Sequence, residues 1–141
     1  MSRLVGTWEL VSWSVRVGER TQFPFGGDVK GLLIYTVHGS MSATLMRRNR
    51  SPVSATTLAG ATARERASAA AGYLSYGGAY TVDGRRVVHH VQVSLLPNWV
   101  GHDQVRNIRW VGGDLELSSE PETGRSGLEI VNRLLWRRVS P

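Results

Sequence analysis

Apolar and polar residues alternate along much of the chain, and the most regular stretch is RRVVHHVQVSL at residues 86–96. This stretch predicts a strand, because alternate side chains of a strand point to opposite faces of its sheet. One face would be almost entirely apolar, with His89 as its polar member, whereas the other would be mixed and carry His90. The pattern is typical of a half-buried strand that sends one histidine to each side.

Seven further segments are rich in β-branched, aromatic and other apolar residues and are bounded by turn residues, which predicts strands. They lie at residues 6–15, 29–37, 41–46, 73–82, 104–111, 115–119 and 128–138. Short turns would join neighbouring strands into hairpins at residues 38–40, 83–84 and 112–114.

Two segments do not follow this alternation. Residues 59–71 are rich in alanine, and Thr62 followed by Glu65 fits a capping box, which predicts one short helix that ends near Gly72. We expect this helix to cover an opening or a flank of the sheet. Residues 21–28 form a predicted loop that holds both phenylalanines of the protein, so a covering role is expected there too.

Eight consecutive antiparallel strands and one short helix predict an all-β protein with a single domain over residues 1–141. An up-and-down barrel would leave no unpaired strand edge, although a two-sheet sandwich produces the same local signals. A barrel of about eight strands is wide enough to hold one small ligand.

Composition narrows the range of functions. The chain contains no cysteine, which excludes disulfides and thiolate chemistry and is compatible with the cytoplasm, where we expect the protein. No stretch approaches the ~20 apolar residues of a membrane-spanning helix. The net charge of +6 comes from dispersed arginines, so we expect a solvated basic surface and no nucleic-acid partner. The alternative is a salt-dependent interaction module formed by Arg47, Arg48 and Arg50.

Three segments resemble a known family. The opening GTWELVSW at residues 6–13 resembles the glycine-x-tryptophan signature of lipocalins and their calycin relatives. Residues 24–45, PFGGDVKGLLIYTVHGSMSATL, and residues 87–106, VVHHVQVSLLPNWVGHDQVR, are similar to the lipocalin-like domain family of bacteria and fungi. The resemblance covers nearly the whole chain. It implies an eight-stranded antiparallel lipocalin-like barrel with an internal cavity, in a family that occurs in natural-product pathways and includes cyclases and isomerases.

The strand that begins at Gln104 places Arg106 and Trp110 on the face with the larger apolar residues. If this face points inward, the guanidinium of Arg106 needs an acidic group, a carbonyl, an aromatic face or a ligand oxygen. The alternative is a structural arginine that stacks on Trp8, which we expect to be buried at the closed end of the barrel. The same parity places Asn132 of the last strand inside.

Either histidine of the central strand could act as a general acid or base, because the reference pKa of histidine, ~6.5, lies near working pH. A two-residue turn at residues 83–84 would put Tyr80 on the same face as His89, whereas a three-residue turn would pair Tyr80 with His90. Adjacent strand residues diverge, so the two histidines cannot chelate one ion together, and we expect no metal and no other cofactor.

We expect from these residues that the protein binds a small hydrophobic, oxygen-bearing molecule. The resemblance implies that it promotes a cofactor-free cyclisation or isomerisation of that molecule in natural-product biosynthesis. A hydrogen bond to a substrate carbonyl would stabilise charge in the transition state. The alternative function is a non-catalytic carrier or sensor, and outward-facing apolar residues would allow a homodimer. The catalytic candidates are His89, His90 and Arg106. The ligand-binding candidates are Tyr35, Met41, Tyr80, Gln104, Trp110 and Asn132.

Overall fold

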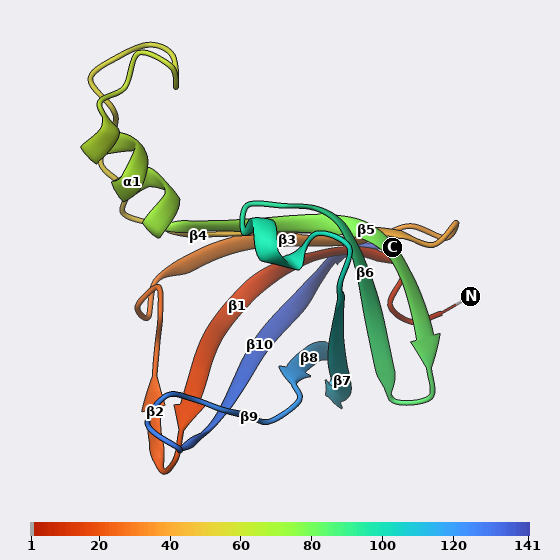
Figure 1. Cartoon of the computed structure of the whole chain (residues 1–141). Helices are drawn as coiled ribbons and strands as arrows, with labels where there is room; N and C mark the ends of the chain where they lie inside the picture. Colours follow the sequence, from red (N-terminus) through yellow and green to blue (C-terminus); the bar gives the residue numbers. More distant parts are fainter. Residues whose placement is uncertain (1) are drawn as a thin grey trace.

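The computed structural model describes residues 2–141. In this part of the chain, eight antiparallel strands close into a barrel, in the order β1-β3-β4-β5-β6-β7-β8-β10, and β10 pairs back with β1 (Figure 1). The eight barrel strands are β1 (Gly6–Val17), β3 (Val29–Tyr35), β4 (Ser40–Arg47), β5 (Tyr73–Asp83), β6 (Arg86–Ser94), β7 (Asp103–Val111), β8 (Asp114–Ser119) and β10 (Glu129–Ser140). The predicted all-β barrel is confirmed, and the two-sheet sandwich is wrong.

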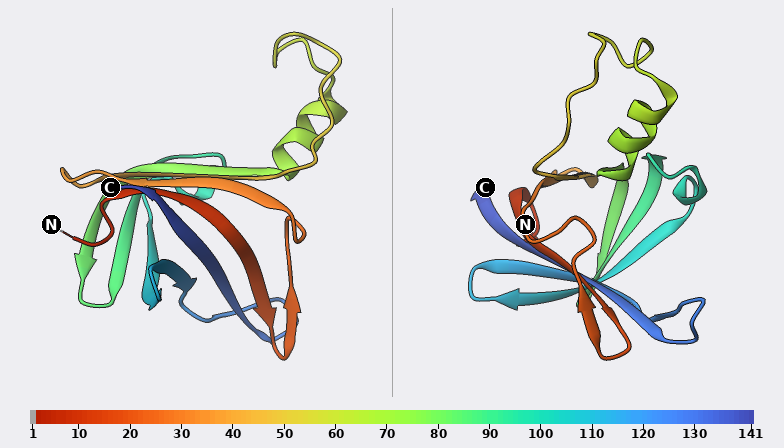
Figure 2. Two further views of the ribbon diagram at one scale, coloured as in Figure 1. Left: turned by 180° about the vertical axis from the view of Figure 1, so that it is seen from behind. Right: turned by 90° about the vertical axis from the view of Figure 1, so that its left-hand side faces the viewer.

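Three short elements accompany the barrel strands. The strand β2 (Arg20–Gln22) pairs with the end of β1, and β9 (Glu122–Thr123) pairs with the start of β10. A single 3-10 turn, η1 (Pro97–Trp99), follows β6 at the point where proline was expected to end the strand. The two ends of the chain lie side by side, because Thr7 pairs with Ser140 (Figure 2).

The hairpin between β5 and β6 decides which histidine faces inward. Asp83 pairs with Arg86 across a two-residue turn, and Tyr80 pairs with His89. The three-residue alternative, which pairs Tyr80 with His90, is therefore wrong. His89 lies on the inner face and is 1% exposed.

A β-bulge interrupts the same pair of strands. Gly77 pairs with Val93 and Gly78 with Val91, so Gln92 is an extra residue on β6. An extra residue reverses the alternation beyond it, and Val93, which the sequence places on the apolar face, is 66% exposed. Glycine is required at position 78, because a Cβ there would collide with the backbone oxygen of His90.

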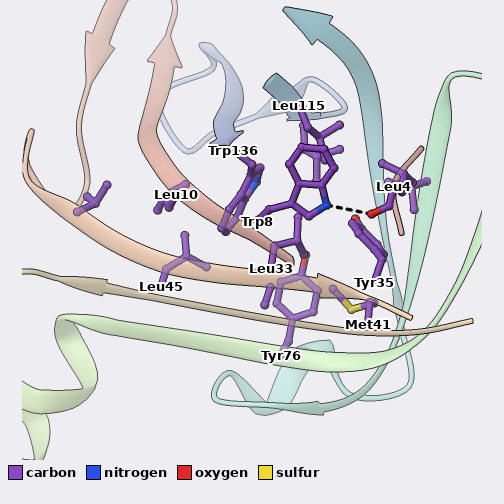
Figure 3. Packing of buried hydrophobic residues seen from close by; sticks show 14 of the residues in the cluster. Leu4, Trp8, Leu10, Leu33, Tyr35, Met41, Leu45, Tyr76, Leu115 and Trp136 are labelled. Atoms are coloured by element: carbon purple, nitrogen blue, oxygen red, sulfur yellow. Dashed lines mark hydrogen bonds between the residues drawn. The ribbon is translucent and has the colours of Figure 1, made fainter. Parts of the chain in front are cut away.

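Trp8 is completely buried at the closed end of the barrel, as predicted (Figure 3). Its Nε1 donates a hydrogen bond to the backbone oxygen of Leu4 at 2.9 Å, and its ring lies 5.9 Å from that of Trp110. The guanidinium that stacks on Trp8 belongs to Arg138, at 4.1 Å, and not to Arg106. A structural role for Arg106 as the partner of Trp8 is therefore wrong.

The helix α1 (Ala63–Ala71) begins with the predicted capping box, in which Thr62 and Glu65 bond each other's backbone N–H groups. None of its nine residues is buried, and it stands away from the barrel beyond β4 and β5 (Figure 1). It covers the barrel only in part, through three alanines at the rim of the cavity described below. The loop at 21–28 does cover the interior, because Phe25 is buried against Trp13.

Candidate functional site

A cavity of about 780 Å³ lies inside the barrel and opens beside α1 and η1. Its aromatic lining consists of Trp13, Phe25, Tyr73, Tyr76, Trp99 and Trp136. Its polar lining consists of His89, Gln104, Arg106, Ser119, Glu122 and Asn132. A largely apolar cavity with a few polar groups is the usual form of a site for a small organic molecule.

Arg106 is a charged residue that lines the cavity. Its guanidinium donates to the backbone oxygen of Val105 at 2.9 Å and to Oε1 of Gln104 at 3.1 Å. Among residues 2–141, no carboxylate forms an ion pair with it. A guanidinium carries five N–H donors, so several remain available to a ligand oxygen.

His89 lies between two tyrosine hydroxyls deep in the cavity. Its Nε2 is 2.6 Å from the hydroxyl of Tyr35, and its Nδ1 is 2.7 Å from the hydroxyl of Tyr76. Burial, together with the positive charge of Arg106, lowers the pKa of His89 to about 3, so the imidazole is neutral at pH 7. Burial also raises the pKa of both tyrosines, which therefore keep their protons.

The other histidine of β6 lies outside the barrel. His90 contacts the carboxylate of Asp103 through Nδ1 at 2.8 Å and the hydroxyl of Thr81 through Nε2 at 3.0 Å. It does not line the cavity. Because neighbouring residues of a strand point to opposite faces, His90 cannot reach a ligand that sits beside His89, and it is removed from the candidate site.

Of the six ligand-binding candidates, Gln104 and Asn132 line the cavity. Asn132 accepts a hydrogen bond from Nε1 of Trp13 at 2.9 Å, which fixes its side chain against the wall.

The other four candidates do not line the cavity. Tyr35 lies behind His89, and Met41 pairs with Tyr35 in the buried core. Tyr80 packs on the ring of Tyr35 at 4.7 Å, and its hydroxyl donates to the backbone oxygen of Thr36. Trp110 lies between Trp8 and Arg3. Strand parity shows that these side chains point inward, but it does not show how far along the barrel axis they lie.

Tyr76, Trp13 and Trp99 are site residues that the sequence did not reveal. The rings of Tyr76 and Trp99 meet edge to face at 5.5 Å, and both line the cavity. The glycine pair after Tyr76 is a sequence signal for an irregular strand. It does not indicate that the Tyr76 hydroxyl reaches His89.

The arginines proposed as an interaction module each have a partner within the chain. Arg47 donates to the backbone oxygen of Pro24, Arg48 pairs with Asp28 at 2.6 Å, and Arg50 donates to the backbone oxygen of Ala69. Arg47 and Arg48 contact the loop that precedes β3, and Arg50 contacts α1, so none of the three is a free side chain.

Two observations concern membranes and metals. Across residues 2–141, no helix is long and apolar enough to cross a membrane. Over the same residues, no three histidine, aspartate or glutamate side chains come together as the ligands of a metal ion would.

Comparison with known proteins adds two similarities to this geometry. The chain is 36% identical over 107 residues to the 4'-hydroxy-3'-methoxypropiophenone carrier protein ppsC of Aspergillus oryzae (strain ATCC 42149 / RIB 40). That match covers 70% of this chain and 96% of the relative. A crystal structure of an uncharacterized protein from Bacteroides eggerthii is 11% identical, with a TM-score of 0.47 over 96% of this chain and 98% of that one.

The family match is broader. The lipocalin-like domain matches residues 5–139, which include all eight barrel strands apart from the last residue of β10. The chain therefore belongs to the lipocalin-like domain family.

Proposed function

We propose that this protein binds a small aromatic molecule bearing a carbonyl oxygen and carries it inside the barrel. The observation that supports this proposal most strongly is the position of Arg106. Its guanidinium faces an aromatic-walled cavity and, within residues 2–141, has no carboxylate partner. The two neutral oxygens that it already bonds, those of Val105 and Gln104, use only some of its five N–H donors, and a ligand carbonyl would supply a further charge-assisted contact.

The dimensions and lining of the cavity agree with such a ligand. A volume of about 780 Å³ is ample for one substituted aryl ketone. Tyr76 and Trp99, which meet edge to face, offer ring surfaces for packing an aromatic ligand. The relative from Aspergillus oryzae is named as a carrier of 4'-hydroxy-3'-methoxypropiophenone, an aryl ketone, and this name makes the same molecule the natural first probe.

A second candidate function is the cofactor-free cyclisation or isomerisation of such a ketone. It is favoured by the presence of two hydrogen-bond donors, Arg106 and the hydroxyl of Tyr76, in one sheltered cavity. Two donors on a carbonyl oxygen would stabilise the negative charge that develops on that oxygen in the transition state. In this scheme His89 is a positioning residue, because both of its nitrogens already contact tyrosine hydroxyls.

Replacing Arg106 with methionine tests the proposed carrier function. The variant keeps much of the apolar stem and loses the charge, so we expect affinity for 4'-hydroxy-3'-methoxypropiophenone to fall at least tenfold, or about 1.4 kcal/mol. Titration followed by tryptophan fluorescence measures the affinity, because Trp13, Trp99 and Trp136 line the cavity.

The matched control is Arg109→Met on the same strand. The side chain of Arg109 lies outside the barrel, is 71% exposed and pairs with Glu116 at 2.9 Å. Loss of the Arg109 charge should therefore leave the affinity unchanged. Equal affinities for wild type and Arg106→Met would contradict the proposal. Chromatography of the bound probe separates the two functions: unchanged probe supports a carrier, and a product that Arg106→Met does not form supports an enzyme.

A further inference from the structure

The contacts of His89 form a hydrogen-bonded chain across three strands. The hydroxyl of Tyr35 on β3 lies 2.6 Å from Nε2 of His89, and the hydroxyl of Tyr76 on β5 lies 2.7 Å from Nδ1. A neutral imidazole donates from one nitrogen and accepts at the other, and each tyrosine hydroxyl donates once. Two arrangements of the protons are therefore compatible with the distances. Either Tyr35 donates to His89 and His89 donates to Tyr76, which leaves the O–H of Tyr76 free, or both hydrogen bonds run in the opposite direction, which leaves the O–H of Tyr35 free.

The surroundings of the two hydroxyls distinguish these orders. Tyr35 is 1% exposed, and within residues 2–141 its hydroxyl has no hydrogen-bond partner other than His89. If His89 donated to Tyr35, the buried O–H of Tyr35 would have no acceptor among the residues that the structure describes. An unsatisfied buried donor is costly, so Tyr35 must donate to Nε2.

Tyr76 is in a different position because its side chain lines the cavity. Once Tyr35 donates to Nε2, the proton of His89 resides on Nδ1 and is donated to the hydroxyl oxygen of Tyr76. The O–H of Tyr76 is then free, and its acceptor has to come from the contents of the cavity.

We propose that Tyr35 and His89 hold Tyr76 as a hydrogen-bond donor, and that Tyr76 and Arg106 together recognise one acceptor oxygen of the ligand, such as a ketone carbonyl. This assignment of Tyr76 as a specificity-determining residue rests on the proposed binding function. The order of protons in the chain does not depend on it.

The remaining polar groups support an acceptor on the ligand. Oε1 of Gln104 already accepts from Arg106, and Oδ1 of Asn132 already accepts from Trp13. Their amide N–H groups are the parts left unpaired, so the interior presents mainly donors. The carboxylate of Glu122 also lines the cavity, but this residue is exposed.

The tautomer of His89 tests the chain directly. In ¹⁵N-histidine-labelled wild-type protein without ligand at pH 7, two-bond ¹H–¹⁵N correlations should show Nδ1 protonated and Nε2 unprotonated. The signals are assigned by replacing the other three histidines one at a time, as His38→Gln, His90→Gln and His102→Gln. The hydrogen bonds among Tyr35, His89 and Tyr76 are therefore left intact in every sample. A proton on Nε2 of His89 would overturn the proposal.

The role of Tyr76 is tested with propiophenone and propylbenzene, which differ only in the carbonyl. In Tyr76→Phe, the Kd of propiophenone should rise about fivefold relative to the Kd of propylbenzene, which is the effect expected for the loss of one neutral hydrogen bond. Tyr80→Phe is the control, because the Tyr80 hydroxyl bonds Thr36 outside the cavity. An unchanged ratio in Tyr76→Phe would refute the specificity role. If wild type binds neither probe, the binding function fails for simple aryl ketones, and the tautomer measurement still decides the proton order.

Discussion

Acidification from pH 7 to pH 4 is expected to lower the free energy of unfolding by about 3 kcal/mol through His89 alone. In the folded protein the pKa of His89 is lowered from 6.5 to about 3, by burial first and by Arg106 second. The unfolded chain therefore binds a proton below pH 6.5 that the folded chain does not bind until about pH 3. Stability is unaffected by this group above pH 6.5 and falls as the pH drops below it.

Urea denaturation at pH 7, 5 and 4 measures this dependence. The pH dependence should be smaller in His89→Gln than in wild type, even if His89→Gln is less stable at every pH. Carboxylates that titrate in the same range affect both proteins, so the difference between them isolates His89. His90→Gln is the control, because His90 lies outside and contacts Asp103. Identical pH dependence in wild type and His89→Gln would show that His89 is accessible to protons in the folded state.

Trp8→Ala should destabilise the protein by about 3–5 kcal/mol. The side chain is completely buried, lies against Trp110 and carries the guanidinium of Arg138 on its ring. Truncation would leave a cavity and remove the hydrogen bond to Leu4. Chemical denaturation with tryptophan fluorescence measures the loss.

Trp99→Ala is the matched comparison, because Trp99 is half-buried at the mouth of the cavity. Its removal should cost less stability than the Trp8 change and should weaken the binding of aromatic probes. The reverse outcome, with Trp99 needed for stability and Trp8 dispensable, would mean that the packed end and the open end of the barrel have been assigned the wrong way round.

Local patterns were sufficient to predict the eight barrel strands and the helix, but not the short strands β2 and β9. Thr62 and Glu65 form the capping box because its chemistry depends only on residues three apart. Parity along β7 and β10 correctly placed Arg106 and Asn132 on the inner face, because alternation is a local property of a strand.

Features that depend on distant residues could not be predicted in the same way. Strand parity predicts which face a residue lies on, but not its position along the barrel axis. The sequence therefore could not show that Trp110 and Met41 lie away from the cavity wall. The bulge at Gln92, which turns Val93 outward, depends on the pairing of β6 with β5. The contact between His89 and Tyr76 likewise requires knowledge of how these two strands are aligned.

The arginine that stacks on Trp8 is a similar case. Arg106 and Arg138 are both strand arginines, and the sequence gives no measure of their distances from Trp8. In the structure, the pairing of β10 with β1 places Arg138 directly opposite Trp8. The closed end therefore does not need Arg106, and the guanidinium of Arg106 is available to a ligand in the cavity.

The position of a bound aryl ketone is the most direct test of the binding function. A crystal structure of the complex with 4'-hydroxy-3'-methoxypropiophenone should show one molecule inside the barrel, packed near Tyr76 and Trp99. One of its oxygens should lie within hydrogen-bond distance of the Arg106 guanidinium. A molecule bound on the outer surface, or one inside the barrel whose oxygens all point away from Arg106, would contradict this account.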